Sequence, residues 1–169
     1  MKLSEIYQKG KENLSQRDIG FTIRGVETEF VMTNNRAILD RYTFRQKCID
    51  APKPAMDCSV LGVNLATPVI MSAMTMPIPA IVDNGMVELA RGIKDAGSLL
   101  WTGTPIPDNL AELVKLGVPV AANVKPHEDR RKLFEGLESV QAAGVQWVGL
   151  EIDSGQGTKI LDQVIARDC

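Results

Sequence analysis

From Val60 onward, apolar stretches of strand length alternate with amphipathic stretches of helix length. The pattern predicts strands at residues 68–72, 98–101, 118–124 and 147–152, and helices at 84–96, 108–115, 129–143 and roughly 158–167. The predicted strands are almost continuously apolar, which is typical of parallel strands covered on both faces. Residues 60–169 therefore predict four consecutive β-α units.

Glycine and aspartate residues stand where these predicted helices end and begin. Gly97, Gly117 and Gly144 each follow a predicted helix, at the position where a left-handed cap is needed. Asp108 and Asp129 stand near helix starts, where aspartate is a favourable cap. The ends of the helices thus support the same division into β-α units.

The first 59 residues do not follow this alternation. Residues 1–20 are polar with a weak helical repeat, which predicts a short surface helix. The sequence from Gly20 to Ser59 is irregular, and Pro52 and Pro54 interrupt any long element. We therefore expect residues 1–59 to form a helical and irregular extension that wraps over the α/β part, residues 60–169.

Four β-α units with short connections fit two architectures, a doubly wound open sheet or part of a (β/α)8 barrel. No G-x-G-x-x-G sequence follows the first predicted strand, and no G-x-x-x-x-G-K-[ST] loop occurs in the chain. The usual phosphate-binding signals of open nucleotide-binding sheets are therefore missing. This favours an α/β chain of the TIM-barrel type that carries the first four units, a half barrel.

Charge and hydropathy exclude two classes of partner. Of the 169 residues, 44% are hydrophobic, and 19 Lys and Arg against 21 Asp and Glu give a formal net charge of -2. Without a basic excess to neutralise a phosphate backbone, no nucleic-acid partner is expected. No apolar run reaches the roughly 18 to 20 residues of a membrane span, and the charged start lacks a signal-peptide core. We expect a cytoplasmic protein with no membrane partner.

Cysteine and histidine, two common metal ligands, are scarce. Cys48, Cys58 and Cys169 form no C-x-x-C pair, so we expect free thiols and no metal site. The single histidine, His127, follows Pro126 in a polar loop. We expect His127 to be exposed and structurally incidental.

Polar residues follow each of the predicted strands. In both candidate architectures functional groups gather at the C-terminal ends of the strands. The positions concerned are Ser72-Ala73-Met74, Trp101 to Thr104, Asn123-Val124-Lys125 and Glu151-Ile152-Asp153. Taken singly, each has a purely structural explanation, such as capping a turn or meeting solvent. Their presence at all four strand ends favours a site.

Glu151 is the most informative of these residues. It lies in an otherwise apolar strand, where an ionised carboxylate is costly unless a donor or a cation pairs with it. Lys125 or the N–H group of a ligand could be that partner.

Several of these segments resemble a known family, the FMN-dependent 2-hydroxy-acid oxidases and dehydrogenases. The most specific segment is Arg24 to Asp50, RGVETEFVMTNNRAILDRYTFRQKCID, which is similar to that family's Gly-Ala-Glu-Asp segment followed by E-N-R-x-A-F-x-R. Ser72-Ala73-Met74 stands in the place of the family's T-A-M sequence after the first strand, and Asp129-Arg130 recurs after the third. The resemblance covers residues 20 to 153.

The resemblance implies a TIM-type barrel with FMN at its C-terminal mouth. Backbone groups of Ser72, Ala73 and Met74 would lie against the isoalloxazine ring. A hydroxyl after the second strand would touch the flavin, and either Thr102 or Thr104 is expected to supply it. Asn123 would take the place of a glutamine that bonds the ring, and Glu151 would accept the flavin N3–H as a charge-assisted hydrogen bond.

The resemblance also bears on the substrate and on completeness. Two tyrosines that face the substrate in the family correspond to Phe21 and Lys125 here, and Lys125 could offer a cation to a small anionic substrate. The family's active-site lysine, base histidine and carboxylate-binding arginine come from strands 5 to 8. We therefore expect the N-terminal half of an oxidoreductase acting on a 2-hydroxy acid such as lactate or glycolate. Alone, this half would be inactive.

Such a half would leave sheet edges unpaired, so it would need a missing C-terminal half or a homo-oligomer as its partner. Two alternatives remain open at this point. One is another FMN barrel of the type 2 isopentenyl diphosphate isomerase kind. The other is a non-catalytic half barrel that serves in assembly.

Overall fold

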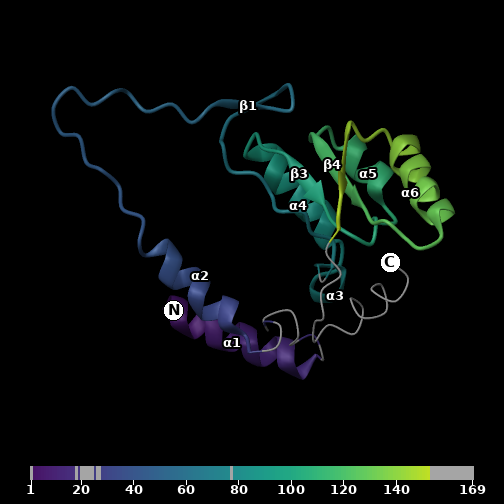
Figure 1. Ribbon diagram of the computed structural model, residues 1–169, viewed down its shortest axis with the longest axis horizontal. Coiled ribbons are helices and arrows are strands. Elements are labelled where there is room, and N and C mark those ends of the chain that lie inside the picture. Colours follow the sequence, from purple (N-terminus) through teal and green to yellow (C-terminus); the bar gives the residue numbers. More distant parts are fainter. Residues whose placement is uncertain (1, 18, 20–24, 26–27, 77, 153–169) are drawn as a thin grey trace. The chain divides into compact units, whose positions relative to one another are not determined.

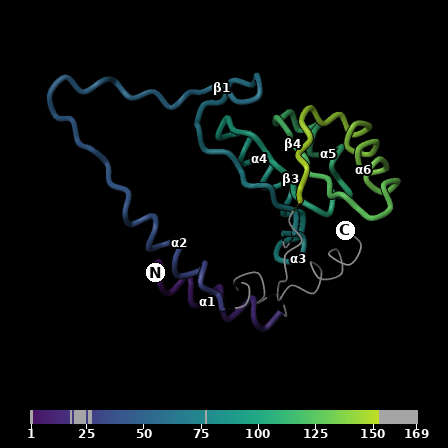
Figure 2. The backbone as a smooth tube through the Cα atoms, viewed as in Figure 1, coloured from purple at the N-terminus to yellow at the C-terminus, as the bar shows by residue number. Residues whose placement is uncertain are grey.

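The computed structural model describes residues 2–17, 19, 25, 28–76 and 78–152 (Figures 1 and 2). The chain divides into two compact units, one containing the residues up to Lys53 and the other running from Pro54 to Asp153. The predicted boundary between residues 59 and 60 stays a prediction. The predicted fourth helix at 158–167 lies outside the described residues. No helix in the described ranges is long and apolar enough to cross a membrane.

The N-terminal unit contains two helices. Helix α1 (Leu3–Gln16) has no buried residue, which confirms the predicted surface helix. Helix α2 (Phe30–Leu39) corrects the prediction that residues 20–59 are irregular throughout. Its sequence, FVMTNNRAIL, holds β-branched residues and asparagines that are weak helix formers, which hid the helix from propensity reasoning. An ion pair between Arg36 and Asp40, one helical turn apart, supports its C-terminal end.

The second unit begins with a hairpin of strands β1 (Cys58–Val60) and β2 (Val63–Leu65). Leu61 and Gly62 form its turn and both have positive φ, 52° and 78°. Two-residue hairpin turns of this kind usually carry Asn-Gly or Gly-Gly, because a side chain such as leucine is strained there. The leucine explains why the sequence pattern did not predict the hairpin.

Three helix–strand pairs follow the hairpin and match their predicted places closely. Their elements, after the short helix α3 (Ile78–Ile81), are α4 (Gly85–Asp95), β3 (Leu100–Thr102), α5 (Leu110–Lys115), β4 (Val120–Val124), α6 (Arg130–Ala142) and β5 (Trp147–Leu150). The strands form one parallel sheet in the order β3-β4-β5, which confirms parallel pairing. Trp101 lies opposite Ala121, which lies opposite Trp147. Within the described residues this sheet is open and does not close into a barrel.

The structure confirms most of the predicted helix caps. Gly97, Gly117 and Gly144 have positive φ of 64°, 78° and 83° after α4, α5 and α6. Asp129 caps α6, since its side chain accepts a hydrogen bond from Arg131 N. At α5 the residue in the cap position is Asn109, one residue beyond the predicted Asp108.

The predicted first strand, residues 68–72, does not form a strand. Pro68 has no N–H to donate, and the backbone groups of Val69 bond to side chains instead. Val69 N–H donates to Thr67 Oγ1 at 3.2 Å, and Val69 O accepts from Ser98 Oγ at 2.5 Å. The segment still runs beside β3, because Met71 N–H donates to Leu99 O at 3.3 Å and Met74 N–H to Trp101 O at 3.2 Å.

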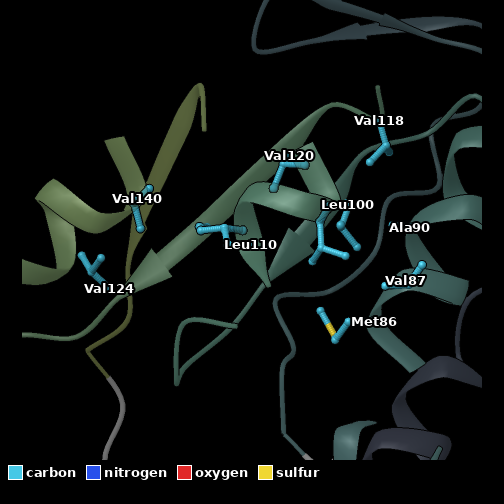
Figure 3. Close-up of a cluster of buried hydrophobic side chains, with 11 residues drawn as sticks. Met86, Val87, Ala90, Leu100, Leu110, Val118, Val120, Val124 and Val140 are labelled. Carbon is cyan, nitrogen blue, oxygen red and sulfur yellow. The ribbon is translucent and has the colours of Figure 1, made fainter. Parts of the chain in front are cut away.

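The two faces of the sheet carry different clusters of side chains. Alternate residues Leu100, Val120, Ala122 and Val124 pack against helices α4, α5 and α6 and form the main core with Leu113 and Val140 (Figure 3). The intervening residues Leu99 and Ala121, with Trp101 and Trp147, face the hairpin residue Leu65. Because side chains alternate along a strand, Asn123 lies on this second face, which we call the hairpin face.

Candidate functional site

Polar side chains from three neighbouring strands meet at the C-terminal edge of the parallel sheet. Asn123 lies in β4, Lys125 follows that strand, and Glu151 follows β5. Glu151 N–H donates to Val124 O at 2.9 Å, which holds Glu151 beside the end of β4. Thr104 comes from the loop after β3. The strand order alone thus brings together groups up to 47 residues apart in the sequence.

The Glu151 carboxylate is the centre of this cluster. Its Oε1 atom accepts a hydrogen bond from Thr104 Oγ1 at 2.9 Å and lies 3.0 Å from Lys125 Nζ. Its Oε2 atom accepts a hydrogen bond from Asn123 Nδ2 at 3.2 Å. This confirms the expectation that Glu151 requires a donor or cation, and Lys125 is that cation.

Burial and pairing act on Glu151 in opposite directions. Burial by itself raises the pKa of the Glu151 carboxyl, but hydrogen bonds from Lys125, Asn123 and Thr104, together with the Lys125 charge, outweigh it. The resulting pKa is lower than usual, so Glu151 is ionised at neutral pH. The side chains of Lys125 and Glu151 are 7% and 22% exposed. The two therefore form a partly desolvated ion pair at the sheet edge.

Asn123 is held from the other side by Trp101 of β3. Trp101 Nε1 donates to Asn123 Oδ1 at 2.9 Å, so the asparagine bridges an indole and a carboxylate. Gly149 of β5 provides the room for this bridge, because a Cβ at residue 149 would overlap Asn123 Oδ1 and lie 3.3 Å from Trp101 Cζ2. A glycine in an otherwise apolar strand indicates such close approach, and it was the signal available in the sequence WVGLE. The sequence placed Trp101 at a strand end but predicted no contact for it, and it predicted no role for Gly149.

The predicted segment Ser72-Ala73-Met74 lies against the loop that follows β3. All three residues are exposed, with Met74 at 42%. A Cβ at Gly103 would lie 3.0 Å from Met74 Cα and 3.1 Å from Met74 N, so any larger residue would push this backbone away by a few tenths of an ångström. Thr75 Oγ1 closes the contact by donating to Gly103 O at 3.0 Å.

The two candidate threonines occupy different places. Thr102 is completely buried on the helix-covered face of β3, and its Oγ1 has no hydrogen-bond partner among the described residues. Thr104 is partly exposed and bonds Glu151 on the opposite side of the strand. A flavin contact by either threonine stays a prediction.

His127 is half-buried, which corrects the prediction that it is exposed. The loop that carries it starts at the buried Lys125, whose ion pair with Glu151 keeps the beginning of the loop against the sheet. Across the part of the chain that the structure describes, no group of three or more His, Cys, Asp or Glu side chains could hold a metal ion.

Comparison with known proteins decides the family. The sequence matches the FMN-dependent dehydrogenase family over residues 10–163, which is most of the chain. The chain belongs to this family. The family's cofactor is FMN, and the relationship confirms the resemblance found in residues 20–153.

The related FMN-dependent dehydrogenases are longer proteins. An L-lactate oxidase of Nostoc sp. is 26% identical over 158 residues, which are 90% of this chain and 43% of that protein. An L-lactate oxidase of Lentilactobacillus hilgardii is 22% identical over 162 residues, 91% of this chain and 42% of that protein. The chain thus spans less than half the length of these relatives.

Solved structures show the same fold relationship within the FMN-dependent dehydrogenases. A structure described as a lactate oxidase of Pediococcus acidilactici superposes with a TM-score of 0.80 over 99% of this chain and 47% of that chain, at 20% identity. A mandelate oxidase structure superposes with a TM-score of 0.75 over 88% of this chain and 42% of that chain, at 18% identity.

Proposed function

We propose that this chain forms the N-terminal, flavin-contacting half of an FMN-dependent oxidoreductase that oxidises a small 2-hydroxy acid such as lactate. The observation that carries the proposal is the paired donor and acceptor of Asn123 and Glu151 at the C-terminal edge of the sheet. Family membership and the two lactate oxidase relatives support it.

The donor and acceptor atoms present fit a flavin ring. An ionised carboxylate has about four lone-pair sites, and an amide nitrogen has two protons. Glu151 Oε1 already takes two donors, whereas Oε2 takes one, from Asn123 Nδ2. Among the described residues this leaves one acceptor site on Glu151 Oε2 beside one N–H of Asn123. The pyrimidine edge of an isoalloxazine ring presents the complement, an N–H flanked by carbonyl oxygens.

Other residues near Glu151 would complete the contacts with the flavin. Thr104 and Lys125 would hold the Glu151 carboxylate in place, and the exposed residues Ser72, Ala73 and Met74 would lie along the ring. Gly103 has no Cβ, which allows the segment to lie close to the loop after β3. When bound, FMN supplies the acceptor for the electrons that leave the hydroxyl-bearing carbon.

We propose that the complete protein is a (β/α)8 barrel and that this chain alone is inactive. Its relatives are more than twice as long, so the groups that remove the substrate protons would come from the other half of the barrel. A missing half or a second copy would pair with the outer edge of β5. Lys125 would face a small anionic substrate as a hydrogen-bond donor. The lactate oxidase relatives favour this function over the isomerase and the non-catalytic half barrel.

Titration of the purified chain with FMN, followed by flavin fluorescence, tests cofactor binding. We expect Glu151→Gln to weaken binding about tenfold or more, because a charge-assisted acceptor is lost. The exposed Glu88→Gln on α4 is the matched control and should bind normally. A Lys125→Gln, Glu151→Gln double variant avoids leaving a buried unpaired cation. If both Glu151 variants bind FMN as the unchanged chain does, Glu151 is not the acceptor.

The activity is tested on the chain expressed together with any coding sequence that follows it in the same reading frame. We expect L-lactate or a similar 2-hydroxy acid to bleach the flavin absorbance under anaerobic conditions. If the flavin-loaded protein is not reduced by any 2-hydroxy acid, the proposed reaction is wrong.

A further inference from the structure

The orientation of the Asn123 side chain decides what this edge of the sheet can offer a ligand. The oxygen and nitrogen ends of a primary amide are nearly equal in size, so partners rather than packing choose between the two orientations. In the structure Oδ1 faces Trp101 Nε1 at 2.9 Å, and Nδ2 faces Glu151 Oε2 at 3.2 Å. Asn123 therefore presents N–H groups on the Glu151 side.

Trp101 can support only this orientation. An indole N–H is a donor and never an acceptor, unlike a hydroxyl or an imidazole, which can reverse its role. If the Asn123 amide turned over, its N–H groups would meet the indole N–H, and its oxygen would meet the Glu151 carboxylate. Both contacts would change from attractive to repulsive.

The backbone around Asn123 is adapted to the same arrangement. Gly149 lacks the Cβ that would overlap Asn123 Oδ1, and the same missing atom would lie 3.3 Å from Trp101 Cζ2. The glycine therefore lets the indole and the amide oxygen meet above β5. The buried Asn123 side chain has these two partners among the described residues, on β3 and after β5.

We propose that Trp101 is a positioning residue of the flavin site, which fixes the Asn123 amide so that its N–H groups lie beside the free acceptor of Glu151. The mechanism rests on the proposed function for its consequence, flavin binding, but the orientation itself is a property of the chain without ligand. Trp101 would touch no reacting atom and would act through Asn123.

The orientation is tested on the flavin-free chain by NMR, with Trp101→Phe and the matched control Trp147→Phe. Trp147 lies in the same cluster on the hairpin face, so the control loses the same ring while the hydrogen bond from Trp101 to Asn123 is kept. We expect Trp101→Phe to shift the Asn123 side-chain amide signals. It should also raise the pKa of Glu151, which is faced by Lys125, Asn123 and Thr104. Trp147→Phe should leave the Asn123 signals and the pKa of Glu151 unchanged. If Trp101 served only for packing, the two variants should behave alike.

A second variant keeps the test decisive if Trp101→Phe does not fold. Asn123→Asp retains an oxygen toward Trp101 and replaces the nitrogen that faces Glu151. We expect the Trp101 indole N–H to keep its slow hydrogen exchange in this variant, while the pKa of Glu151 rises. If the Trp101 indole exchanges as fast as that of Trp147 in the unchanged chain, the proposal is overturned.

The consequence for the cofactor is measured separately by FMN titration. We expect Trp101→Phe to weaken FMN binding by about two- to tenfold, the effect of one misdirected hydrogen bond, while Trp147→Phe changes it less than twofold. If Trp101→Phe alters the Asn123 signals but FMN binds the unchanged protein neither as this chain alone nor together with any coding sequence that follows it, the proposed function fails and the positioning role stands. If both indole variants weaken binding equally, Trp101 acts by packing alone and the proposal is wrong.

Discussion

Replacing Gly149 by alanine tests most directly the geometry of the cluster that Asn123, Lys125, Thr104 and Glu151 form at the ends of the strands. A Cβ at this position would overlap Asn123 Oδ1, a side-chain atom that already accepts the hydrogen bond of the Trp101 indole. The Asn123 amide therefore has to turn away. Gly149 pairs with Asn123 in the ladder between β4 and β5, so the backbone cannot move apart without breaking the sheet.

The size of the effect follows from the contacts that are lost. Turning Asn123 away removes its bonds to Trp101 and Glu151, each with a net value of about 0.5–1.5 kcal/mol. Alanine in a strand regains roughly 0.5–1 kcal/mol over glycine, because it restricts the unfolded chain. We therefore expect Gly149→Ala to lower the free energy of unfolding by about 0.5–2 kcal/mol.

Urea unfolding monitored by circular dichroism measures this change, with Gly92→Ala as the matched control. A Cβ at Gly92 in α4 meets nothing within 4 Å, so this variant should gain about 0.5–1 kcal/mol from helix propensity. If Gly149→Ala is as stable as the unchanged chain and the Trp101 indole N–H keeps its slow exchange, the close approach of Asn123 to Gly149 is refuted.

Two further predictions concern the core and the ion pair. Leu113→Ala, at a side chain 0% exposed in the main core, should lower the free energy of unfolding by about 2–5 kcal/mol, measured by urea unfolding. An unchanged midpoint would contradict the core assignment. Because the pKa of Glu151 is lowered in the folded chain, its pairing stabilises the fold above the ordinary glutamate pKa. This contribution of the ion pair to stability is lost as the pH falls through the lowered pKa of Glu151. The Lys125→Gln, Glu151→Gln double variant should therefore lose less stability on acidification, and an identical pH profile would be evidence against the pairing.

The alternation of strands and helices could be predicted because a parallel strand that is buried on both faces has an almost continuously apolar sequence. Residues 118–124 are apolar for this reason, and every residue of β4 inside them is buried. Residues 147–152 are apolar as well and contain β5, but Val148 and Leu150 are exposed among the described residues, so this strand is not covered on both faces. Residues 68–72 are also almost continuously apolar, and yet they form no strand. Pro68 and Val69 are exposed and Ile70 is only partly buried, so the apolar run does not mark a buried strand here. Strand pairing also requires available backbone groups, but Pro68 lacks an N–H, and the N–H and C=O of Val69 bond to side chains.

The candidate site could be predicted in part for a topological reason. Parallel strands bring their C-terminal ends together whatever the side chains are, so Asn123, Lys125 and Glu151 were expected to be neighbours. The contacts between them depend on how far each side chain reaches across a strand. That reach is set by Gly149 and Trp101, which lie on different strands and form no local pattern with Asn123. Sequence reasoning therefore found the edge but not the arrangement.

The ion pair constrains how Lys125 can serve an anionic substrate. Removing one member of a buried ion pair typically costs about 3–5 kcal/mol, because the other charge stays buried without compensation. Lys125 is only 7% exposed and lies 3.0 Å from the Glu151 carboxylate, so its charge is largely neutralised where it lies. A substrate carboxylate that competed for Lys125 would have to displace Glu151 and forfeit the bonds from Thr104 and Asn123 as well. We therefore expect Lys125 to act toward a substrate as a hydrogen-bond donor. The net positive charge that an anionic substrate requires has to come from cations outside this ion pair.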